Sequence, residues 1–381
     1  MFSPSERNRR LTAAATLMKK ENLAGMLMVG NGAVGTNAYG CFRYLADNRV
    51  YYHLQAAILV PDAEPVAIAG TLVSQLEFKN RSFIKDCRVA PNILDGIVSV
   101  FREKGLVSGT IGVCLDLLPA SWFLALRRVF PSLKFIDVTE PVFRLRNLHS
   151  AEEIETIRAC AKLADAAYQA VCDTVKPGMA EYEVAAALEY AVHQRGGEGN
   201  FTLLSSGRFS LTDNKLPCIH AATDKRIQIG DCVAMEITPR FNGYWTQLVR
   251  TICVGEPSAD LITMHDVGVD VLKKAREDLI PGQPIRQIAA RVRKYTEDAG
   301  YTFSLPCGHI CAIDLNEERL DESNDRVLLP GMAVILHPSI LAPNITTGVF
   351  WGETFLITEN GNERLMDSGD GLMIVKSSDR S

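Results

Sequence analysis

The sequence predicts two domains, an α/β domain over residues 1–145 and an α+β domain over residues 146–381. The chain has 381 residues, of which 47% are hydrophobic, so it can build large apolar cores. Its first part alternates apolar strand-like runs with helical patterns, whereas its second part opens with two helices and continues as short apolar runs between turns. The short, basic and polar segment at 144–150 separates the two patterns, which places the domain boundary there.

The first domain begins with an amphipathic helix, in which Leu11, Ala15 and Leu17 oppose basic side chains. Three apolar runs predict buried strands, and the segments between them carry helical periodicity. The expected strands cover 24–29, 56–61 and 110–116, and the clearest helices between them cover 71–79 and 118–128.

The second domain begins with the clearest helix of the chain. Ser150 and Glu153 have the spacing of a capping box, apolar residues then recur at helical spacing, and Pro177 and Gly178 end the pattern. Further helices are expected over 180–195, 258–275 and 284–299, and strands over 232–237, 333–340 and 353–361. These strands predict a curved antiparallel sheet framed by helices. Gly243 and Gly308 are expected in turns.

Charge and composition exclude several classes of partner. A net charge of -5 gives no electrostatic reason to expect nucleic acid, and no apolar stretch of about 18 residues predicts a membrane span. The start of the chain lacks the apolar core of a secretion signal. Ten scattered cysteines, without a CxxC pair, are typical of buried thiols in a reducing cytoplasm, so we expect a cytoplasmic protein.

Four stretches carry a resemblance to a known family. RLRNLHSAEEIETIRACAKLADAAYQAV with KPGMAEYEVAAALE resembles the linker and first helices of the catalytic domain in the creatinase/prolidase/methionine-aminopeptidase (M24) family. GDCVAMEITPRFNGYWTQLVRTICVG resembles its central hairpin, CGHICAIDLNEE its histidine loop, and PGMAVILHPSI with GVFWGETFLITENG its closing strands. The match covers about 144–361 and implies a pita-bread C-terminal domain.

The resemblance also identifies the family's metal-ligand positions, most of which have changed. Metal-dependent members hold two divalent ions with two aspartates, one histidine and two glutamates. Those positions are occupied here by Glu236, Gln247, His309, His337 and Gly352, with Glu353 following the glycine. Too few carboxylates remain to offset two divalent cations, so we expect no dinuclear site and no metal cofactor. A single metal held by His309, His337 and Glu236 is the alternative.

A metal-free branch of the family, which includes creatinase, implies catalysis by histidines and carboxylates. His220 matches the histidine upstream of the central hairpin and is the expected general base and acid. His309 and His337 would hold a substrate oxygen, and Glu236 would orient an imidazole or bind a cationic nitrogen. Creatinase keeps a glutamate at the position of His337, so the reaction need not be creatine hydrolysis. The alternative for His337 is an ordinary core residue.

The resemblance implies that a small substrate is shared between two subunits. Arg49, or alternatively Arg43, matches the arginine that creatinase offers from a partner subunit to the substrate carboxylate, which implies a homodimer with the active site near the interface. A solvated surface arginine is the other interpretation. Further expected substrate-binding residues are Gln247, Glu353, Tyr244 and Trp351.

The leading functional hypothesis is therefore metal-independent hydrolysis of a non-peptide C–N bond in a small, carboxylate-bearing nitrogen compound, as in creatinase or ectoine hydrolases. A lyase or rearrangement enzyme acting on a modified amino acid is the second hypothesis, because histidines can also remove a C–H proton. A non-catalytic pita-bread binding module is the third.

Overall fold

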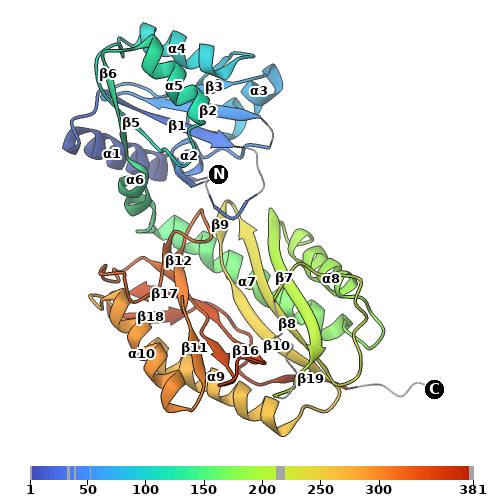
Figure 1. Cartoon of the computed structure of the whole chain (residues 1–381). Helices are drawn as coiled ribbons and strands as arrows, with labels where there is room; N and C mark the ends of the chain where they lie inside the picture. Colours follow the sequence, from blue (N-terminus) through green and yellow to red (C-terminus); the bar gives the residue numbers. More distant parts are fainter. Residues whose placement is uncertain (1, 32–34, 38–39, 52, 212–218, 377–381) are drawn as a thin grey trace. The chain divides into compact units, whose positions relative to one another are not determined.

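The protein is divided into two compact units, Met1–Glu152 and Glu153–Ser381. The computed structural model describes residues 2–31, 35–37, 40–51, 53–211 and 219–376 (Figure 1). The first unit thus ends at 152, whereas the sequence predicts a boundary at 145. We describe each unit by itself.

The N-terminal unit is built on a six-stranded mixed sheet with strand order β4-β3-β2-β1-β5-β6. The central pair β1–β2 and its neighbour pair β2–β3 are antiparallel, and the outer pairs are parallel. The strands are β1 (Gly25–Asn31), β2 (Leu54–Leu59), β3 (Val66–Ala69), β4 (Asp86–Val89), β5 (Gly109–Val113) and β6 (Leu133–Asp137). The three strands predicted from apolar runs correspond to β1, β2 and β5, so those predictions are confirmed.

The described residues of this unit also form six helices. They are α1 (Pro4–Lys20), α2 (Gly40–Ala46), α3 (Leu72–Arg81), α4 (Ile93–Glu103), α5 (Ala120–Val129) and α6 (Thr139–Arg146). Helix α1 begins after Ser3, whose hydroxyl accepts the Glu6 N–H, and has proline at its first position. Ile97, Val100 and Phe101 of α4 belong to the same buried cluster as Ile58 and Ile68 of the sheet. The α/β class predicted for this half is therefore confirmed.

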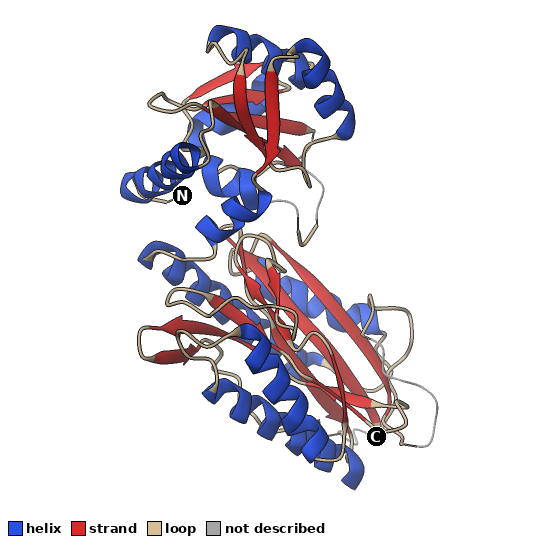
Figure 2. Ribbon diagram, turned by 60° about the vertical axis from the view of Figure 1, so that its left-hand side comes forward, coloured by secondary structure: helices blue, strands red, loops and turns tan. Residues whose placement is uncertain are grey.

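Four long helices frame the strands of the C-terminal unit, as the sequence predicts (Figure 2). They are α7 (Ala151–Thr174), α8 (Glu181–His193), α9 (Ala259–Glu277) and α10 (Ile285–Asp298). Helix α7 starts immediately after Ser150. Its apolar stripe, which includes Ile157, Ala161 and Ala164, is buried, as the helical spacing indicates.

The strands of the C-terminal unit form three sheets rather than the single curved sheet that we expected. The first has the order β19-β10-β8-β7, with β9 paired to β8. The others have the orders β11-β15-β16 and β13-β12-β14-β17-β18. The bounds are β7 (Gly199–Arg208), β8 (Asp231–Phe241), β9 (Tyr244–Trp245), β10 (Leu248–Val254), β11 (Thr302–Ser304), β12 (Gly308–Cys311), β13 (Glu318–Arg319), β14 (Ala333–Leu336), β15 (Ser339–Leu341), β16 (Gly348–Phe350), β17 (Glu353–Thr358), β18 (Gly361–Arg364) and β19 (Met373–Val375).

Two sequence predictions fail within these sheets. The strand expected over 333–340 is split into β14 and β15, which join different sheets on either side of His337 and Pro338. Proline lacks the N–H that a continuous ladder requires. Gly308 lies in β12 and not in a turn. A Cβ atom at Gly308 would lie 2.1 Å from the Ile335 carbonyl oxygen, so close strand approach explains this glycine.

Gly243 does lie in a turn, as expected. Asn242 and Gly243 both have positive φ, at 47° and 90°, and connect β8 to β9 through a two-residue hairpin loop. In the described part of the chain, we find no helix that is long and apolar enough to cross a membrane. The nine cysteines within the described residues are free thiols.

Candidate active site

The central hairpin of β8 and β10 positions two of the predicted site residues. Its register places Glu236 opposite Val249, and alternation along the strands puts Gln247 and Thr238 on the same face as Glu236. The Gln247 side-chain amide donates to the Thr238 hydroxyl at 3.2 Å and to the Glu236 carboxylate at 3.5 Å. The hairpin therefore brings together the two residues that occupy the family's aspartate positions.

The two predicted histidines of the closing strands lie beside each other. His309 comes from β12, and His337 directly follows β14, the antiparallel neighbour of β12. Their ring centroids are 5.2 Å apart in an edge-to-face arrangement. The ring of Phe350, which lies on β16, has its centroid 5.1 Å from that of His337. The backbone N–H of His337 donates to the Cys307 carbonyl at 2.8 Å, which fixes the start of the His337–Pro338 segment.

Gly352 joins the hairpin to the histidine sheet. Its backbone exchanges two hydrogen bonds with Val249, at 2.8 Å and 3.2 Å, and Val249 is the cross-strand neighbour of Glu236. A Cβ atom at Gly352 would lie 2.3 Å from the Cβ of His337 and 2.7 Å from the Leu336 carbonyl oxygen. His337 thus occupies the space that a side chain at 352 would need, and the family's second glutamate has no room here.

Among the described residues, several polar atoms of this region are buried and have no hydrogen-bond partner. They are Oε1 of Gln247, Nδ1 of His309 and Nδ1 of His337. Buried polar atoms are normally hydrogen-bonded, because an unpartnered one costs about 1–3 kcal/mol. Three such atoms from residues at family site positions indicate a surface arranged to bind a polar ligand.

Burial controls the protonation of the site. It raises the pKa of Glu236 to about 7. Burial, with a smaller contribution from the neighbouring His337, lowers the pKa of His309 to about 3, and burial lowers the pKa of His337 to about 4. At neutral pH both imidazoles are therefore uncharged, and both the protonated and the ionised form of Glu236 are accessible. Each neutral imidazole carries one N–H donor and one lone pair.

His220 lies further out, on an exposed loop. Its backbone carbonyl accepts the Leu204 N–H at 2.8 Å, along the edge of β7 that faces away from β8. Two strand spacings, about 10 Å, therefore separate its backbone from that of β8. Its ring Nδ1 lies 2.7 Å from the Ala221 carbonyl oxygen, and its ring makes no hydrogen bond to Glu236, His309 or His337 in the described part of the chain.

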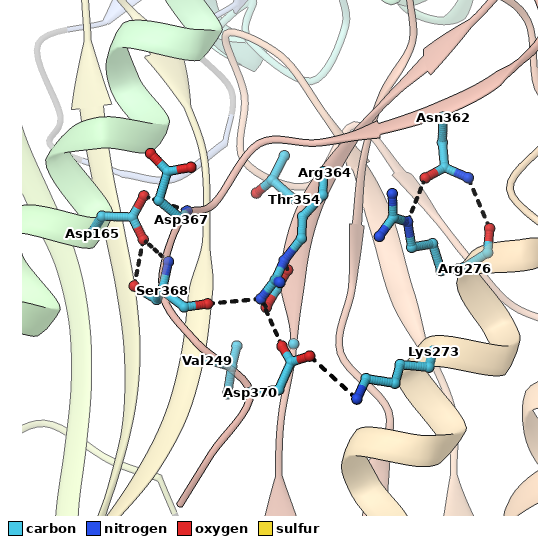
Figure 3. A network of polar contacts seen from close by, with 12 residues as sticks. Asp165, Val249, Lys273, Arg276, Thr354, Asn362, Arg364, Asp367, Ser368 and Asp370 are labelled. Atoms are coloured by element: carbon cyan, nitrogen blue, oxygen red, sulfur yellow. Dashed lines mark hydrogen bonds and ion pairs between the residues drawn. The ribbon is translucent and has the colours of Figure 1, made fainter. Parts of the chain in front are cut away.

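Glu353 belongs to a different environment from Gly352. Because side chains alternate along β17, Glu353 points to the opposite face, where Arg250 and Arg364 hold its carboxylate. Arg364 also contacts Asp370 at 2.7 Å, and Lys273 lies 3.4 Å from Asp370 (Figure 3). This geometry does not favour the substrate-binding role expected for Glu353, since both of its oxygens are already engaged.

The two aromatic residues expected at the pocket wall are fully buried. The Tyr244 hydroxyl donates to Glu153 of α7 at 2.5 Å. Trp351 stacks against the Arg250 guanidinium at 4.1 Å and meets His265 edge-on at 4.7 Å. Trp351 also lines a cavity of about 60 Å³ with Glu353, Arg364 and Lys273, outside the group of Glu236, Gln247 and the two histidines.

The two candidate carboxylate-binding arginines belong to the N-terminal unit. Arg43 is buried on α2 and faces the Asp47 carboxylate, whose pKa is raised by burial although the charge of Arg43 opposes this shift. Arg49 is half-buried, with its guanidinium 4.8 Å from the Tyr51 ring. Their binding to a substrate stays a prediction.

Sequence reasoning missed two hydroxyl groups that hold the site. Thr238 accepts the Gln247 side-chain amide, and Thr354 Oγ1 accepts the Gln247 backbone N–H at 2.8 Å while donating to its carbonyl at 3.0 Å. Both threonines are fully buried. Thr238 lies two residues after Glu236, and Thr354 lies two residues after Gly352, so each points to the same face as the site position before it. This spacing is the signal that could have identified both threonines.

The residues at the family's metal positions do not fit a pair of divalent ions. Glu236, with its raised pKa, is the one carboxylate left among them, Gln247 offers a neutral amide, and Gly352 has no space for a ligand. Among the described residues, no three or more histidine, cysteine, aspartate or glutamate side chains are grouped so that they could hold a metal ion.

Comparison with known proteins places this arrangement in a family. The profile of Metallopeptidase family M24 matches residues 155–359. An Xaa-Pro dipeptidase of Pyrococcus furiosus is 31% identical over 237 residues, 61% of this chain and 66% of that protein. Creatinase of a Bacillus species is 26% identical over 387 residues, 96% of this chain and 91% of that protein.

The fold is also found among solved structures. The X-Pro aminopeptidase of Thermotoga maritima superposes with a TM-score of 0.85 at 20% identity, covering 96% of this chain and 99% of that one. This likeness confirms the predicted fold class, an α/β domain followed by a pita-bread domain. Since the profile covers more than half of its residues, the chain belongs to metallopeptidase family M24, a family of hydrolases.

Proposed function

We propose that this protein is a metal-independent hydrolase that cleaves a non-peptide C–N bond in a small, carboxylate-bearing nitrogen compound. The observation that carries the proposal is the group of Glu236, Gln247, His309 and His337 beside a glycine that cannot be replaced by a ligand. At neutral pH this group holds at most about one negative charge, far from the four that two divalent cations require. Similarity to a creatinase along nearly the whole chain supports the same branch of the family.

His220 is the proposed general base and acid. A carbonyl oxygen can only accept a hydrogen bond, so the short contact with Ala221 favours the proton on Nδ1, and in the neutral ring this leaves the lone pair on Nε2. Nε2 would take a proton from water as the water attacks the substrate carbon, and it would return that proton to the departing nitrogen. The exposure of His220 keeps the ring accessible to water and substrate.

The neutral imidazoles and Glu236 would position the substrate. An N–H of His309 or His337 can donate to a carbonyl or carboxylate oxygen of the substrate. Because these imidazoles are neutral, they avoid the desolvation cost that a buried charged donor would carry. Glu236, in its ionised form, suits a cationic nitrogen. No donor in the described part of the chain reaches the amide oxygen of Gln247, so this oxygen can accept a hydrogen bond from the substrate. In a homodimer, Arg49 or Arg43 of a second copy would bind the substrate carboxylate.

The primary test combines elemental analysis with kinetics. The full-length protein, purified without added metal, is analysed for transition metals and then incubated with creatine, ectoine and an Xaa-Pro dipeptide, with and without a chelator. We expect less than one metal ion per two chains and hydrolysis of a non-peptide substrate that the chelator leaves unchanged. Two stoichiometric metal ions, or chelator-sensitive activity, would overturn the proposal.

Variants then test the role of His220. General acid–base groups contribute about 10²–10⁴ in rate, so His220→Ala should lower kcat by at least about 100-fold. His193→Ala is the matched control, because His193 is also exposed and also places Nδ1 near a carbonyl oxygen, that of Gly197. Full activity of a folded His220→Ala protein would contradict the assigned role.

A metal-dependent Xaa-Pro dipeptidase is the second candidate function, favoured by the 31% identity to the Pyrococcus furiosus dipeptidase. Hydrolysis of the Xaa-Pro dipeptide only after addition of Mn²⁺ or Co²⁺ would support it. The remaining enzymatic alternative is a lyase or rearrangement enzyme. The mass of the products distinguishes it from a hydrolase, because hydrolysis adds a water molecule and elimination or rearrangement does not. Binding of a protein without turnover of any small substrate would support a binding module.

A further inference from the structure

Two cysteines face each other across the central hairpin. Cys232 is the second residue of β8 and Cys253 the last but one of β10, and the register pairs them directly. Directly opposite residues of an antiparallel pair project to the same face of the sheet. Both side chains therefore point into the same apolar core cluster of the C-terminal unit.

The hydrogen-bond pattern shows that this pair is of the close type. Val249 uses both its N–H and its carbonyl on Gly352, so both groups point away from β8. The Val254 carbonyl instead accepts the Gly230 N–H, on the β8 side. Alternation along β10 then makes Cys253, like Val249, a member of a non-hydrogen-bonded pair. Such pairs have Cα atoms about 4.5 Å apart, within the range of about 4.4–6.8 Å that a disulfide spans.

The two thiols influence each other electrostatically. The interaction with the Cys253 thiol, together with burial, raises the pKa of Cys232, and the same interaction lowers the pKa of Cys253. The reactive form is the thiolate, and the lowered pKa favours its formation on Cys253, beside the Cys232 thiol that the register places directly opposite. Cys232 is 9% exposed and Cys253 is 1% exposed, so access is restricted to a small oxidant.

We propose that Cys232 and Cys253 form an oxidative modification site, at which hydrogen peroxide converts the two thiols into a cross-strand disulfide. The Cys253 thiolate attacks one peroxide oxygen, which breaks the O–O bond and gives a sulfenic acid and hydroxide. Cys232 sulfur then attacks the sulfenic sulfur, forms the S–S bond and expels the second oxygen as water, with the thiol proton. In total, two thiols and one peroxide give one disulfide and two waters.

The bond would join the strands that carry Glu236 and Gln247. Cys232 lies four residues before Glu236 on the same strand face, a distance of about 13 Å along β8. The proposal depends on the hairpin register and not on the identity of the substrate, so it can fail or succeed independently of the proposed function.

The test uses native full-length protein treated with hydrogen peroxide, quenched with catalase, and alkylated in denaturant without a reductant. Peptide mass spectrometry should then find the Cys232 and Cys253 peptides joined and lighter by two hydrogen atoms. Dithiothreitol should release both as free thiols. The oxidised protein should also unfold at a higher urea concentration than the reduced protein, because the bond closes a loop in the unfolded chain.

Three controls make the outcome decisive. Cys160 and Cys311 are mutually close and fully buried, and should remain reduced under the same treatment. Cys232→Ser should lose the joined peptide, and the Cys253 sulfenic acid, which then has no thiol to attack it, should be trapped by dimedone. When the protein is unfolded in guanidinium chloride before oxidation, the same oxidant should join many different pairs of cysteines. Two results would overturn the proposal. In the first, peroxide oxidises other cysteines of the native protein while Cys232 and Cys253 are both still alkylated. In the second, either of these two cysteines is joined mainly to a different cysteine.

Discussion

At the scale of single residues, positions 337 and 352 act as one unit. The Cα and Cβ of residue 337 and the Leu336 carbonyl oxygen fill the place that a Cβ of residue 352 would take. The backbone of this chain therefore comes so close at these two positions that it requires glycine at 352. A glutamate at 352 does not fit this arrangement of the backbone.

Substitution of the glycine tests this coupling. Gly352→Ala should destabilise the protein by about 1–3 kcal/mol or more, because the new methyl group overlaps His337 and the Leu336 carbonyl. Gly369→Ala is the control, since a Cβ there meets nothing within 4 Å, and it should change stability by less than about 0.5 kcal/mol. Urea unfolding measures both. Equal midpoints for the two variants would contradict the contact.

A second residue-scale prediction concerns Glu236. Its pKa of about 7 in the folded protein lies above the ordinary value of 4.5, so the native state retains the proton longer than the unfolded state. Its stability contribution is present below about pH 4.5 and is lost as pH rises through 7. Glu236→Gln, which cannot ionise, should therefore be more stable than the parent at pH 8, by about 2 kcal/mol after allowance for partial exposure, and similar to it at pH 4.5.

Urea unfolding of both proteins across this pH range is the measurement. An advantage of Glu236→Gln that is the same at both ends of the range would show that ionisation is not the cause. If Glu236 serves the reaction as proposed, the stabilised variant should also be less active, a common trade-off at functional sites.

Much of the site was accessible from sequence at this scale, and part of it was not. Glu236, Gln247, His309 and His337 could be named because the flanking motifs fix their positions. The contact between His337 and Gly352 could not, because it depends on how closely two strands approach after the break at Pro338. The partners of Glu353 could not be predicted for a related reason, because its side chain points to the opposite face from position 352 and meets Arg250 and Arg364 there.

At the scale of elements, a buried carboxylate organises the loop that carries His220. Glu181, the first residue of α8, is fully buried and accepts hydrogen bonds from the backbone N–H groups and hydroxyls of Ser206 and Thr223. Lys225 adds an ion-dipole contact to the Ser206 carbonyl. These contacts connect α8, β7 and the 219–228 segment three residues from His220.

Removal of this charge should loosen the loop. Four hydrogen bonds hold the pKa of Glu181 below its usual value despite opposing burial, so its stabilisation is present above about pH 4.5 and is lost as pH falls below that value. Glu181→Gln should lose about 2 kcal/mol at pH 7 and little at pH 3. Glu189→Gln, exposed on the same helix, is the control. Hydrogen exchange of residues 219–228 should rise in the first variant alone, and unchanged exchange would contradict the role of Glu181.

Helices were predictable from sequence at this scale, whereas sheet pairing was not. The apolar spacing of α7 and the flanking Pro177 and Gly178 are local signals, and the structure follows them closely. Strand runs were also recognised, but their division into three sheets depends on non-local pairing. The parallel pairing of β19 with β10 joins segments more than one hundred residues apart, which no local pattern encodes.

At the scale of the whole molecule, buried histidines should make the fold sensitive to acid. Burial lowers the pKa of His265, His309 and His337, so the unfolded chain binds protons more readily than the native state below about pH 6.5. Stability is therefore full above that pH and decreases as pH falls. His309 alone accounts for about 2 kcal/mol at pH 5, because its folded pKa is far below 5.

Urea unfolding at pH 7 and pH 5 measures this loss. His309→Gln should reduce the difference between the two pH values by about 2 kcal/mol, whereas His193→Gln, on an exposed helix end, should leave it unchanged. A parent protein equally stable at both pH values would show that the imidazoles ionise without cost in the folded state. Composition alone could not predict this sensitivity, since the seven histidines look alike in sequence.

The close approach at Gly352 also decides which engineered changes this pocket can accept. A side chain at 352 would meet the Cα and Cβ of residue 337 and the Leu336 carbonyl oxygen, atoms that remain there under every substitution of His337 except glycine. A designer who wants an additional ligand at 352 must therefore move the backbone around residue 337, because an exchange of side chains makes no room for it.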